Sequence, residues 1–548
     1  MNSNELRRKF LEFFEGKGHK VAPSSSLIPA DASVLFTTAG MQQFKPYYLG
    51  EKSPFGFNVC SCQKCFRTSD IEEVGDESHL TFLEMLGNFS FGGYFKEEAI
   101  KLAHEFLFDE LKLPLAKAVF TVFEGNSAVP EDKESIEIWK KLGIPETKIK
   151  KCGREDNFWG PTGEEGPCGP TTEIHFDGTE VWNLVFNEYF QDKTGKLTPL
   201  KQKGVDTGMG LERLAIAVQD KSSVYETDLF LPIVIQIPSE NEKAKRIISD
   251  HVKSSVFLIA DGILPSNLER GYVLRRVLRR AIRYGKMLNL QENFLIPLAQ
   301  KAIEIYKNIY PELKSKETDI ITAIQNEEEK FEKSLEEGLK QFEKGTDAFE
   351  LYTSYGFPLE LTLELAKEKG KNINLEEFNK KFKEHQELSR TASSGMFKGG
   401  LADASEQAVK YHTANHLLLA ALRQVLGSHV SQKGSNITAE RLRFDFVHPG
   451  KMTDKEIKEV EDIVNQKIKD DLTVICQEMT LAEAKEKGAT GVFEDKYEEK
   501  VKVYSINDFS KEICGGPHVK RTGQLGSFKI IKEESSSAGI RRIRAVLE

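Results

Sequence analysis

The sequence predicts a multidomain protein of mixed α and β structure, and three observations support this prediction. The chain has 548 residues, which at roughly 150 residues per domain corresponds to three or four domains. Its composition is 39% hydrophobic and 29% charged, which is enough apolar material for ordinary buried cores. Strand-like runs occur towards both ends of the chain, whereas the middle has a helical pattern.

The composition also restricts the class of protein. There is no run of about 18 apolar residues, and Leu6, Phe10, Phe13 and Phe14 are spaced as in an amphipathic helix rather than a signal peptide. Seven cysteines without a secretory signal indicate free thiols or metal ligands. We therefore expect a cytoplasmic protein that does not contact membranes. Its net charge of −9 means that nucleic acid could bind only at a local basic patch.

The first region, residues 1–236, alternates helical stretches with strand-like runs and reads as an α/β or α+β domain. Its clearest strands are predicted at 119–124 (VFTVFE) and 181–186 (VWNLVF).

The rest of the chain divides at a predicted linker. Residues 237–390 read as helical, with long Glu/Lys-rich stretches such as 317–344. Small and polar residues concentrate at 391–404, which is typical of a linker, and 405–548 reads as a separate α+β domain. Its expected elements are a helix at 406–426 and strands near 442–446 and 501–504.

Two histidine-containing motifs predict a metal site in the last domain. His412 and His416 are spaced to share one face of a helix, and Cys514 and His518 follow in CGGPH. Three imidazoles and one thiolate form a ligand set that Zn²⁺ favours, and four protein ligands are typical of structural zinc, so catalysis would require one of them to be weak or displaced. The alternative is a group of ordinary core or surface histidines. A second cluster, Cys60, Cys62 and Cys65, lacks a partner cluster and is a poor zinc pattern.

Arg67 ends a strand-like run and precedes a polar loop (68–78) and an apolar return strand (80–86). This pattern predicts a hairpin that could place the guanidinium to bind a phosphate or carboxylate bidentately. The alternative is an ordinary surface arginine.

Gly208 and Gly210 lie in VDTGMGLERL, where we expect a turn followed by a helix that begins with Glu212 and Arg213. Glycines permit a ligand to approach the backbone, and a helix N-terminus favours an anion. The segment is neither a dinucleotide-binding GxGxxG motif nor a Walker motif.

Residues 271–286 (GYVLRRVLRRAIRYGK) predict an amphipathic helix with an arginine stripe. The stripe is a candidate contact surface for a phosphate backbone. The alternative is that its charges pair with acidic neighbours. The arginines are Arg275, Arg276, Arg279, Arg280 and Arg283.

Several longer segments are distinctive: SSSLIPADASVLFTTAGMQQFKPYYLG, TFLEMLGNFSFGGYFK, VDTGMGLERLA, FLIADGILPSNLERGYVLRRVLRRAIRYG and HVSQKGS. They resemble the alanyl-tRNA synthetase family, and the resemblance spans essentially the whole chain. It implies a class II synthetase core with an antiparallel sheet (1–236), a helical domain that recognises the tRNA acceptor stem (237–390) and a zinc-binding editing domain (405–548). It also implies that L-alanine is activated with ATP and transferred to tRNA(Ala), and that Ser-tRNA(Ala) and Gly-tRNA(Ala) are hydrolysed.

The resemblance assigns roles within the synthetase core. Arg67 falls in motif 2 and would contact the α-phosphate and the amino-acid carboxylate, while Arg213, in motif 3 with Gly208 and Gly210, would contact adenine or the γ-phosphate. Activation of this kind depends on positioning and charge stabilisation. The other expected ATP contacts are Phe82 or Phe89 and Met85, and Glu180 is the expected Mg²⁺ ligand. The expected alanine contacts are Trp159, Asn183, Val185 and Asp206, with Asp206 pairing the α-ammonium group.

The resemblance also assigns roles outside the core. His412, His416, Cys514 and His518 map onto the family's editing zinc site, and Gln432 is an expected substrate contact. Asn267 matches an Asn that flanks the G3·U70 wobble pair. Thr353 stands where the family usually has Asp, so recognition of this pair could be relaxed.

The chain also departs from the usual family pattern. The β-barrel segment before the HxxxH motif and the C-terminal oligomerisation domain both lack a counterpart, so we expect a monomer. Pro517 replaces a common Thr in CGGPH and removes an N–H donor.

Two other functions remain open on the sequence. One is an editing-only deacylase with a decayed synthetase core, which would lack alanine-dependent ATP–pyrophosphate exchange. The other is a non-catalytic tRNA-binding paralogue, which would bind tRNA without activating or hydrolysing anything. The presence of Arg67, Asp206 and Arg213 disfavours the first.

Overall fold

The computed structural model describes residues 1–31, 34–161, 163–394, 405–438, 440–489, 500–537 and 539–548. The chain forms two compact units, one from Met1–Thr346 with Ser354–Leu361 and one from Asp347–Thr353 with Thr362–Glu548. The predicted region 1–236 and most of the predicted helical region lie together in the first unit. Each unit is described by itself below.

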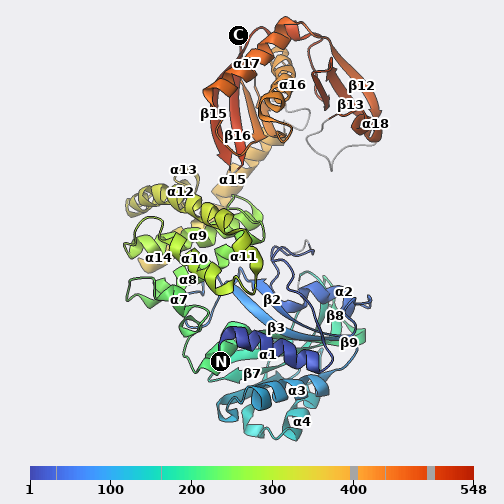
Figure 1. Ribbon diagram of the computed structural model, residues 1–548, viewed down its shortest axis with the longest axis vertical. Helices are drawn as coiled ribbons and strands as arrows, with labels where there is room; N and C mark the ends of the chain where they lie inside the picture. Colours follow the sequence, from blue (N-terminus) through green and yellow to red (C-terminus); the bar gives the residue numbers. More distant parts are fainter. Residues whose placement is uncertain (32–33, 162, 395–404, 439, 490–499, 538) are drawn as a thin grey trace. The chain divides into compact units, whose positions relative to one another are not determined.

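A mixed sheet forms the centre of the first unit (Figure 1). Its order is β1-β2-β3-β9-β8-β7-β4-β5, with β6 beside β7. In this order, the pairings β2/β3, β3/β9, β9/β8, β8/β7 and β7/β4 are antiparallel. The two edge pairings, β1/β2 and β4/β5, are parallel. Both predicted strands, at 119–124 and 181–186, are confirmed as β4 and β8. The strands are β1 (Lys20–Val21), β2 (Asn58–Phe66), β3 (Phe82–Phe91), β4 (Ala118–Phe123), β5 (Ile149–Cys152), β6 (Phe158–Trp159), β7 (Gly166–Phe176), β8 (Thr179–Gln191) and β9 (Leu197–Gly210).

The amphipathic N-terminal stretch forms α1 (Ser3–Gly16) and packs against β2 and β3. Asn2 starts this helix because its side chain accepts a hydrogen bond from the Glu5 backbone N–H, and Glu5 reciprocates. Leu6, Phe10 and Phe14 are fully buried, as the helical spacing predicts. The other helices around the sheet are α2 (Lys45–Tyr48), α3 (Lys96–His104), α4 (Lys133–Lys141), α5 (Arg154–Asn157), α6 (Leu211–Gln219) and α7 (Leu231–Val234).

The remainder of the first unit is helical, as the sequence predicts. Helix α8 packs against α9, α10 and α12, and it also contacts β3. The long charged stretch at 317–344 is helix α12, whose apolar face buries Ile320, Ile324 and Phe331. These helices are α8 (Glu242–Ala260), α9 (Glu269–Met287), α10 (Leu295–Tyr306), α11 (Pro311–Ser315) and α12 (Glu317–Glu343).

The second unit contains two antiparallel sheets, with orders β10-β11-β16-β15 and β12-β13-β14. Helices α16 and α17 pack on each other and against the larger sheet. The predicted helix at 406–426 is confirmed, and Ser405 caps it by accepting from the Ala408 N–H. The predicted strands near 442–446 and 501–504 are confirmed as β11 and β13.

Its helices are α13 (Ala348–Ser354), α14 (Leu359–Glu368), α15 (Leu375–Ser394), α16 (Glu406–Leu426), α17 (Asp454–Lys469) and α18 (Leu481–Glu486), and the end of α13 and the start of α14 lie in the Ser354–Leu361 segment of the first unit. Its strands are β10 (Gln432–Ile437), β11 (Leu442–Val447), β12 (Val474–Thr480), β13 (Lys500–Ile506), β14 (Ser510–Ile513), β15 (Phe528–Ser537) and β16 (Ile540–Leu547). Of the predicted linker, 391–394 continue α15, and 395–404 lie outside the described residues.

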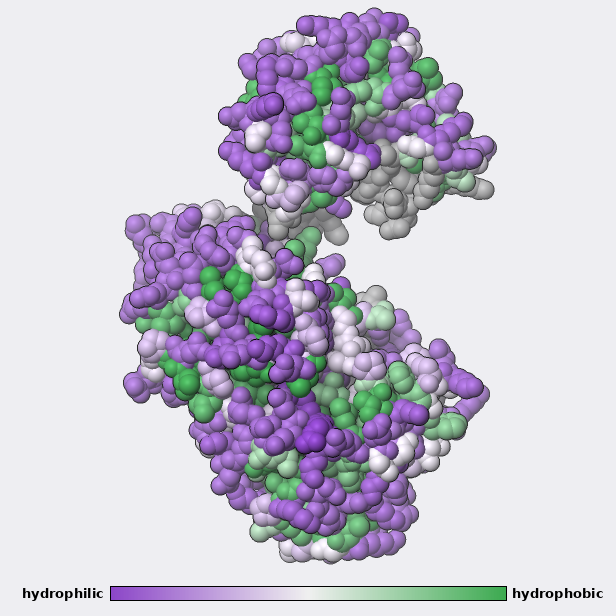
Figure 2. Space-filling view, viewed as in Figure 1, coloured by the Kyte–Doolittle hydropathy of each residue, from purple (hydrophilic) through white to green (hydrophobic). Residues whose placement is uncertain are grey.

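Figure 2 shows a surface on which hydrophilic side chains predominate and hydrophobic ones are scattered. Within the described part of the chain, no helix combines the length and the apolar character that crossing a membrane requires.

Candidate functional site

A cavity of about 250 Å³ lies over the central strands of the first unit. Asp206, Gly208 and Gly210 line it from β9. They face the same side because side chains alternate along a strand. The predicted turn at the two glycines is wrong: β9 continues through Gly210, and α6 begins directly at Leu211.

Glycine at position 208 leaves space beside a close neighbour. A Cβ atom at Gly208 would lie 3.0 Å from the Met85 sulfur on β3. The absence of a side chain therefore keeps the middle of the cavity open between Asp206 and Met85.

Asp206 is a buried carboxylate of the cavity, which Glu173 and Glu212 also line. It is 5% exposed. Among the described residues, no side chain and no backbone N–H donates a hydrogen bond to its carboxylate oxygens. Burial raises its pKa to about 7. A buried carboxylate without a partner is suited to pair with a cationic group of a ligand.

Two further polar atoms in the cavity wall lack partners. The indole Nε1 of Trp159 and the carbonyl Oδ1 of Asn183 are buried and make no hydrogen bond. Both residues line the cavity, as does Val185, which lies beside Asp206 in the β8/β9 register. The wall therefore offers one donor, one acceptor, one carboxylate and an apolar side chain to a small zwitterion.

Two arginines line the same cavity. Arg67 directly follows β2, which pairs with β3 in the predicted hairpin. Its Nε donates to the Thr38 carbonyl at 3.2 Å, and its terminal nitrogens have no hydrogen-bond partner within the described ranges. Arg213 donates from NH1 to the Glu180 carboxylate at 2.9 Å and to its backbone carbonyl at 3.2 Å. Arg67 is thus available to an anionic ligand, and Glu180 already binds Arg213.

Of the three expected adenine contacts, only Met85 lines the cavity. Phe82 is fully buried and stacks on Phe257, with ring centroids 3.9 Å apart. Strand alternation places Phe82 on the face opposite to Met85. Phe89 shares the face of Met85 but is buried against Phe44, with ring centroids 4.7 Å apart. Both phenylalanines belong to the core.

A buried group of four charges lies beneath the cavity. Lys253 on α8 donates to Glu212 at 2.7 Å, and Arg7 donates from Nε to Glu84 at 2.7 Å. Glu212 also accepts from the Glu84 backbone N–H at 3.1 Å. Tyr310 donates to Glu84 at 2.9 Å. The group is electrically neutral, and it connects α6, which carries Arg213, to the helical part of the unit.

Electrostatics in this group follow from burial and pairing. Burial opposes ionisation of Glu84, but Arg7, Lys253 and the Tyr310 hydroxyl together outweigh it and lower the pKa of Glu84. Burial raises the pKa of Glu212, and Lys253 counteracts this shift. Of these residues, only Glu212 stood out in the sequence, and then as the start of a helix rather than as a member of a charged group.

The arginine stripe of α9 makes contacts inside the protein. Arg279 donates from Nε to Glu327 at 2.8 Å, and Arg275 forms an ion pair with the same carboxylate, with its Nε at 3.2 Å. Arg276 pairs with Glu72. The other two, Arg280 and Arg283, are each 4% exposed, and Arg280 donates to the Ile71 carbonyl at 2.6 Å. The amphipathic helix is confirmed, but its charges pair internally, which is the alternative that the sequence left open.

The two residues expected to flank the wobble pair lie in different units. Asn267 is in the first unit, where its Oδ1 contacts Arg275. Thr353 is in the second, where its hydroxyl donates to the Phe349 carbonyl at 2.9 Å within α13.

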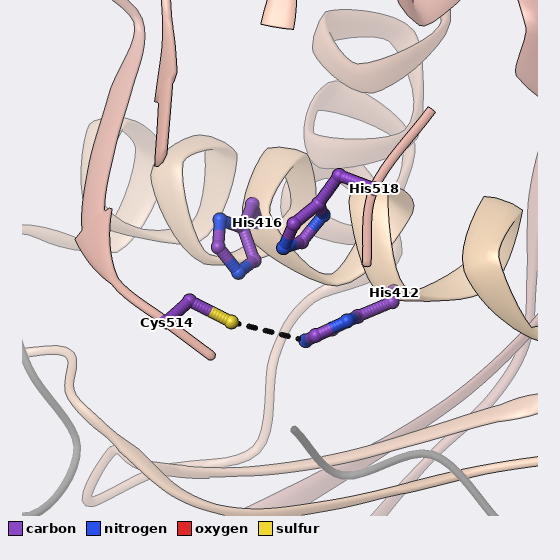
Figure 3. A group of neighbouring side chains, drawn as sticks. All are labelled: His412, His416, Cys514 and His518. Atoms are coloured by element: carbon purple, nitrogen blue, oxygen red, sulfur yellow. Dashed lines mark hydrogen bonds between the residues drawn. The ribbon is translucent and has the colours of Figure 1, made fainter. Parts of the chain in front are cut away.

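The four predicted metal ligands converge in the second unit (Figure 3). One ligand atom of each of His412, His416, Cys514 and His518 lies within 4.8 Å of the others. His412 and His416 project from one face of α16, and Cys514 follows β14. The Cys514 sulfur lies 3.3 Å from His412 Nε2. No other such group of three or more potential ligands occurs among the described residues.

Hydrogen bonds orient two of the imidazoles. His412 Nδ1 donates to the Pro517 carbonyl at 3.2 Å, so its Nε2 carries the lone pair. Thr413 donates its one hydroxyl proton to the Val409 carbonyl at 3.2 Å, so its oxygen accepts from His518 Nδ1, also at 3.2 Å. His518 Nε2 is buried without a partner.

The cluster fits a soft cation such as Zn²⁺. His416 Nδ1 is also buried without a partner, so metal coordination would satisfy two orphaned nitrogens. Burial lowers the pKa of His412 to about 4 and that of His416 to about 3. Both rings are therefore neutral near pH 7 and able to bind a metal. A Cβ atom at Gly516 would lie 2.0 Å from the His412 ring, so only glycine permits this approach.

Three neighbouring residues complete the site. Gln432 accepts from Asn415 Nδ2 at 3.2 Å, next to His416 on α16. Glu512 lies 3.8 Å from His416 Nε2 and is buried. Thr413 and Glu512 were missed from the sequence, although the position of Thr413 between two histidines was a usable signal.

The cysteine alternative has a simple structural explanation. Cys60 and Cys65 are buried in β2, where burial raises the pKa of each thiol to about 12. Such thiols remain protonated and behave as core residues.

Comparisons with known proteins agree with this geometry. The family model for class II (A) tRNA synthetases matches residues 5–433, and the model for the threonyl and alanyl tRNA synthetase second additional domain matches residues 501–544. An alanine–tRNA ligase of Treponema denticola is 52% identical, and one of Borrelia hermsii is 50% identical, in alignments that cover the whole of both chains. One of Dehalococcoides mccartyi is 38% identical over this whole chain and 80% of its own length.

Proposed function

This chain belongs to the alanyl-tRNA synthetases of class II, and from that premise we propose that it activates L-alanine with ATP and transfers it to tRNA(Ala). The observation that carries this proposal is the single cavity lined by Asp206, Arg67 and Arg213. It combines a carboxylate for an ammonium group with two cations for phosphates and a carboxylate.

The geometry suits the formation of an adenylate. Asp206 pairs with the ammonium group of alanine, and Val185 lies beside it, next to the position of the methyl group. The alanine carboxylate attacks the α-phosphorus of ATP, and pyrophosphate leaves. Arg67 stabilises the negative charge that develops on the phosphate oxygens. ATP brings Mg²⁺ with it, and Glu180 is proposed as a ligand through the oxygen that Arg213 does not bind.

The proposal is tested by charging two tRNA(Ala) transcripts, one with G3·U70 and one with G3·C70. We expect alanine to be attached to the G3·U70 transcript, with Asn267 and Thr353 proposed as the residues that contact the pair. Equal charging of both would indicate a relaxed identity code at Thr353. Failure to charge either, without alanine-dependent ATP–pyrophosphate exchange, would contradict the proposal. Hydrolysis of Ser-tRNA(Ala) in that case would favour the editing-only alternative.

We also propose that the second unit binds Zn²⁺ and hydrolyses Ser-tRNA(Ala) and Gly-tRNA(Ala). The pocket for alanine can exclude larger side chains, but one methyl group is worth only about 1–3 kcal/mol against glycine, so a correction step is useful. Zn²⁺ held by His412, His416, Cys514 and His518 would supply a Lewis acid, or a structural crosslink if all four ligands stay bound. Gln432 is proposed to contact the substrate.

Replacing Cys514 by alanine should separate the two activities. We expect the wild-type protein, purified without chelator, to contain about one zinc per chain and C514A less than about a tenth of that. Ser-tRNA(Ala) deacylation should fall at least about tenfold, and charging should be unchanged because the cavity lies in the first unit. The matched control is C476A, which removes an exposed thiol of the same unit. Wild-type zinc below a tenth, or equal loss of both activities in C514A, would contradict the assignment.

The pKa of Asp206 predicts the pH dependence of alanine activation. Burial raises this pKa to about 7, so the carboxyl group is mostly protonated at pH 6 and mostly ionised at pH 8. The ammonium group needs the ionised form, so kcat/KM for alanine should rise about tenfold per pH unit below 7 and level off above it. ATP–pyrophosphate exchange measures this profile. D206N should be weakly active and show no such rise, and a midpoint below about pH 5 in the wild type would contradict the assignment.

A further inference from the structure

We propose that Glu173 is a positioning residue for alanine, which fixes the side-chain amide of Asn183 so that its carbonyl oxygen receives the substrate's ammonium group. The inference rests on the proposed function and concerns the same cavity. Glu173 also lines the cavity, but its two oxygens already contact Asn183 Nδ2 and His175 Nε2, so it would act through Asn183.

The Glu173 and Asn183 side chains are in direct contact. Asn183 Nδ2 donates to Glu173 Oε1 at 3.0 Å. The two residues are direct neighbours across β7 and β8, and on its other side Asn183 is the neighbour of Gly208 on β9. Asn183 thus has a carboxylate on one side and, on the other, the position where Gly208 leaves space.

The contact with Glu173 determines the orientation of the Asn183 amide. An Asn side chain has a donor end and an acceptor end, and a flip exchanges them. A flipped Asn183 would direct its carbonyl oxygen at the Glu173 carboxylate, and two acceptors repel each other. Glu173 therefore selects the orientation in which Oδ1 is on the far side of the amide, buried and without a partner.

The Glu173 carboxylate is itself held in place by its neighbours. This residue is 9% exposed. Its second oxygen, Oε2, lies 2.9 Å from His175 Nε2 and accepts from the Thr121 hydroxyl at 3.5 Å. Contacts from two strands, β7 and β4, therefore fix the carboxylate. A carboxylate fixed in this way can in turn orient the amide that it binds.

The ligand group that fits this arrangement is an ammonium group. Asn183 and Val185 share one face of β8, and Val185 is the neighbour of Asp206. The cavity wall therefore presents two acceptors without partners, the Asp206 carboxylate and Asn183 Oδ1. An ammonium group has three N–H donors and can satisfy both. The charge of Asp206 attracts it, and the oriented amide adds a directional contact.

The experiment compares three variants in ATP–pyrophosphate exchange. E173M removes the acceptor at similar volume, and E173Q keeps an oxygen for Asn183 Nδ2. E188M is the matched control, because Glu188 is a part-buried carboxylate of β8 that pairs with Lys96 and Lys203 and does not line the cavity.

We expect E173M to raise KM for alanine about 10- to 30-fold and to leave KM for ATP within about twofold. The inhibition constant of L-alaninol, which has the ammonium group but no carboxylate, should rise by a similar factor. E173Q should restore both values to within about threefold of the wild type, and E188M should leave them unchanged.

Other outcomes overturn the inference. Equal increases in KM for alanine and for ATP in E173M would indicate a structural role, and so would an unchanged inhibition constant for alaninol. An E173M enzyme with wild-type KM for alanine would show that Asn183 needs no positioning. If the wild-type protein itself shows no alanine-dependent exchange, the proposed function fails, which is a separate result.

Discussion

Replacing Arg67 by methionine is expected to lower the rate of alanine-dependent ATP–pyrophosphate exchange about 10³-fold. The terminal nitrogens of Arg67 have no partner among the described residues, so they are available to the reacting phosphate and carboxylate. Removing one donor to developing negative charge typically lowers kcat about 10²- to 10³-fold, and a guanidinium can supply two donors. Methionine keeps the aliphatic volume but supplies none.

Two controls make this result specific. R67K keeps the charge but loses the planar fork, so we expect it to recover only part of the activity. R8M removes an arginine of α1 whose side chain is 68% exposed, and it should be fully active. An R67M enzyme within tenfold of the wild-type rate would contradict a role for Arg67 at the reacting phosphate.

Replacing Lys253 by methionine is expected to destabilise the first unit by about 3–5 kcal/mol. Lys253 and Glu212 are both at most 1% exposed, so the variant leaves a buried carboxylate without its cation and near Glu84. Methionine preserves most of the packing against Phe230, whose ring centroid lies 4.3 Å from the Lys253 ammonium. The free energy of unfolding can be followed by tryptophan fluorescence, because Trp139, Trp159 and Trp182 all lie in the first unit.

The double variant K253M/E212Q distinguishes a charge effect from a packing effect. It leaves Arg7 and Glu84 as a balanced pair, so we expect it to recover more than half of the stability lost in K253M. A double variant as unstable as K253M would mean that packing rather than charge determines the loss. Since Glu212 precedes Arg213 in α6, both variants should also be assayed for exchange.

The sequence was informative where a local pattern determines the outcome. The helix at 406–426 has a cap at Ser405 and a regular apolar pattern, and the structure begins and ends it at those residues. The hairpin near Arg67 and the four-ligand group follow from strand alternation and helical spacing in the same way. These features depend on residues that are close in sequence or chemically unusual.

Long-range partners explain the errors. An arginine stripe has the same sequence pattern whether it faces RNA or a carboxylate, and Arg279 meets Glu327 only after the chain has folded back through α12. The same holds for Phe82, because its stacking on Phe257 of α8 depends on a residue far away in the sequence. Glu173 resembled an ordinary strand residue, because its proposed role depends on Asn183, its neighbour across the β7/β8 pairing.

The cluster of Figure 3 also has a consequence for folding. Its ligands come from two segments 98 residues apart, at positions 416 and 514. Closing a flexible loop of that length costs about 4 kcal/mol of chain entropy. A zinc ion bound to both segments would act as a reversible crosslink, because its binding free energy contributes directly to closing this loop. Chelation would then loosen the segment that ends at Cys514, and the metal would determine how well the second unit resists proteolysis.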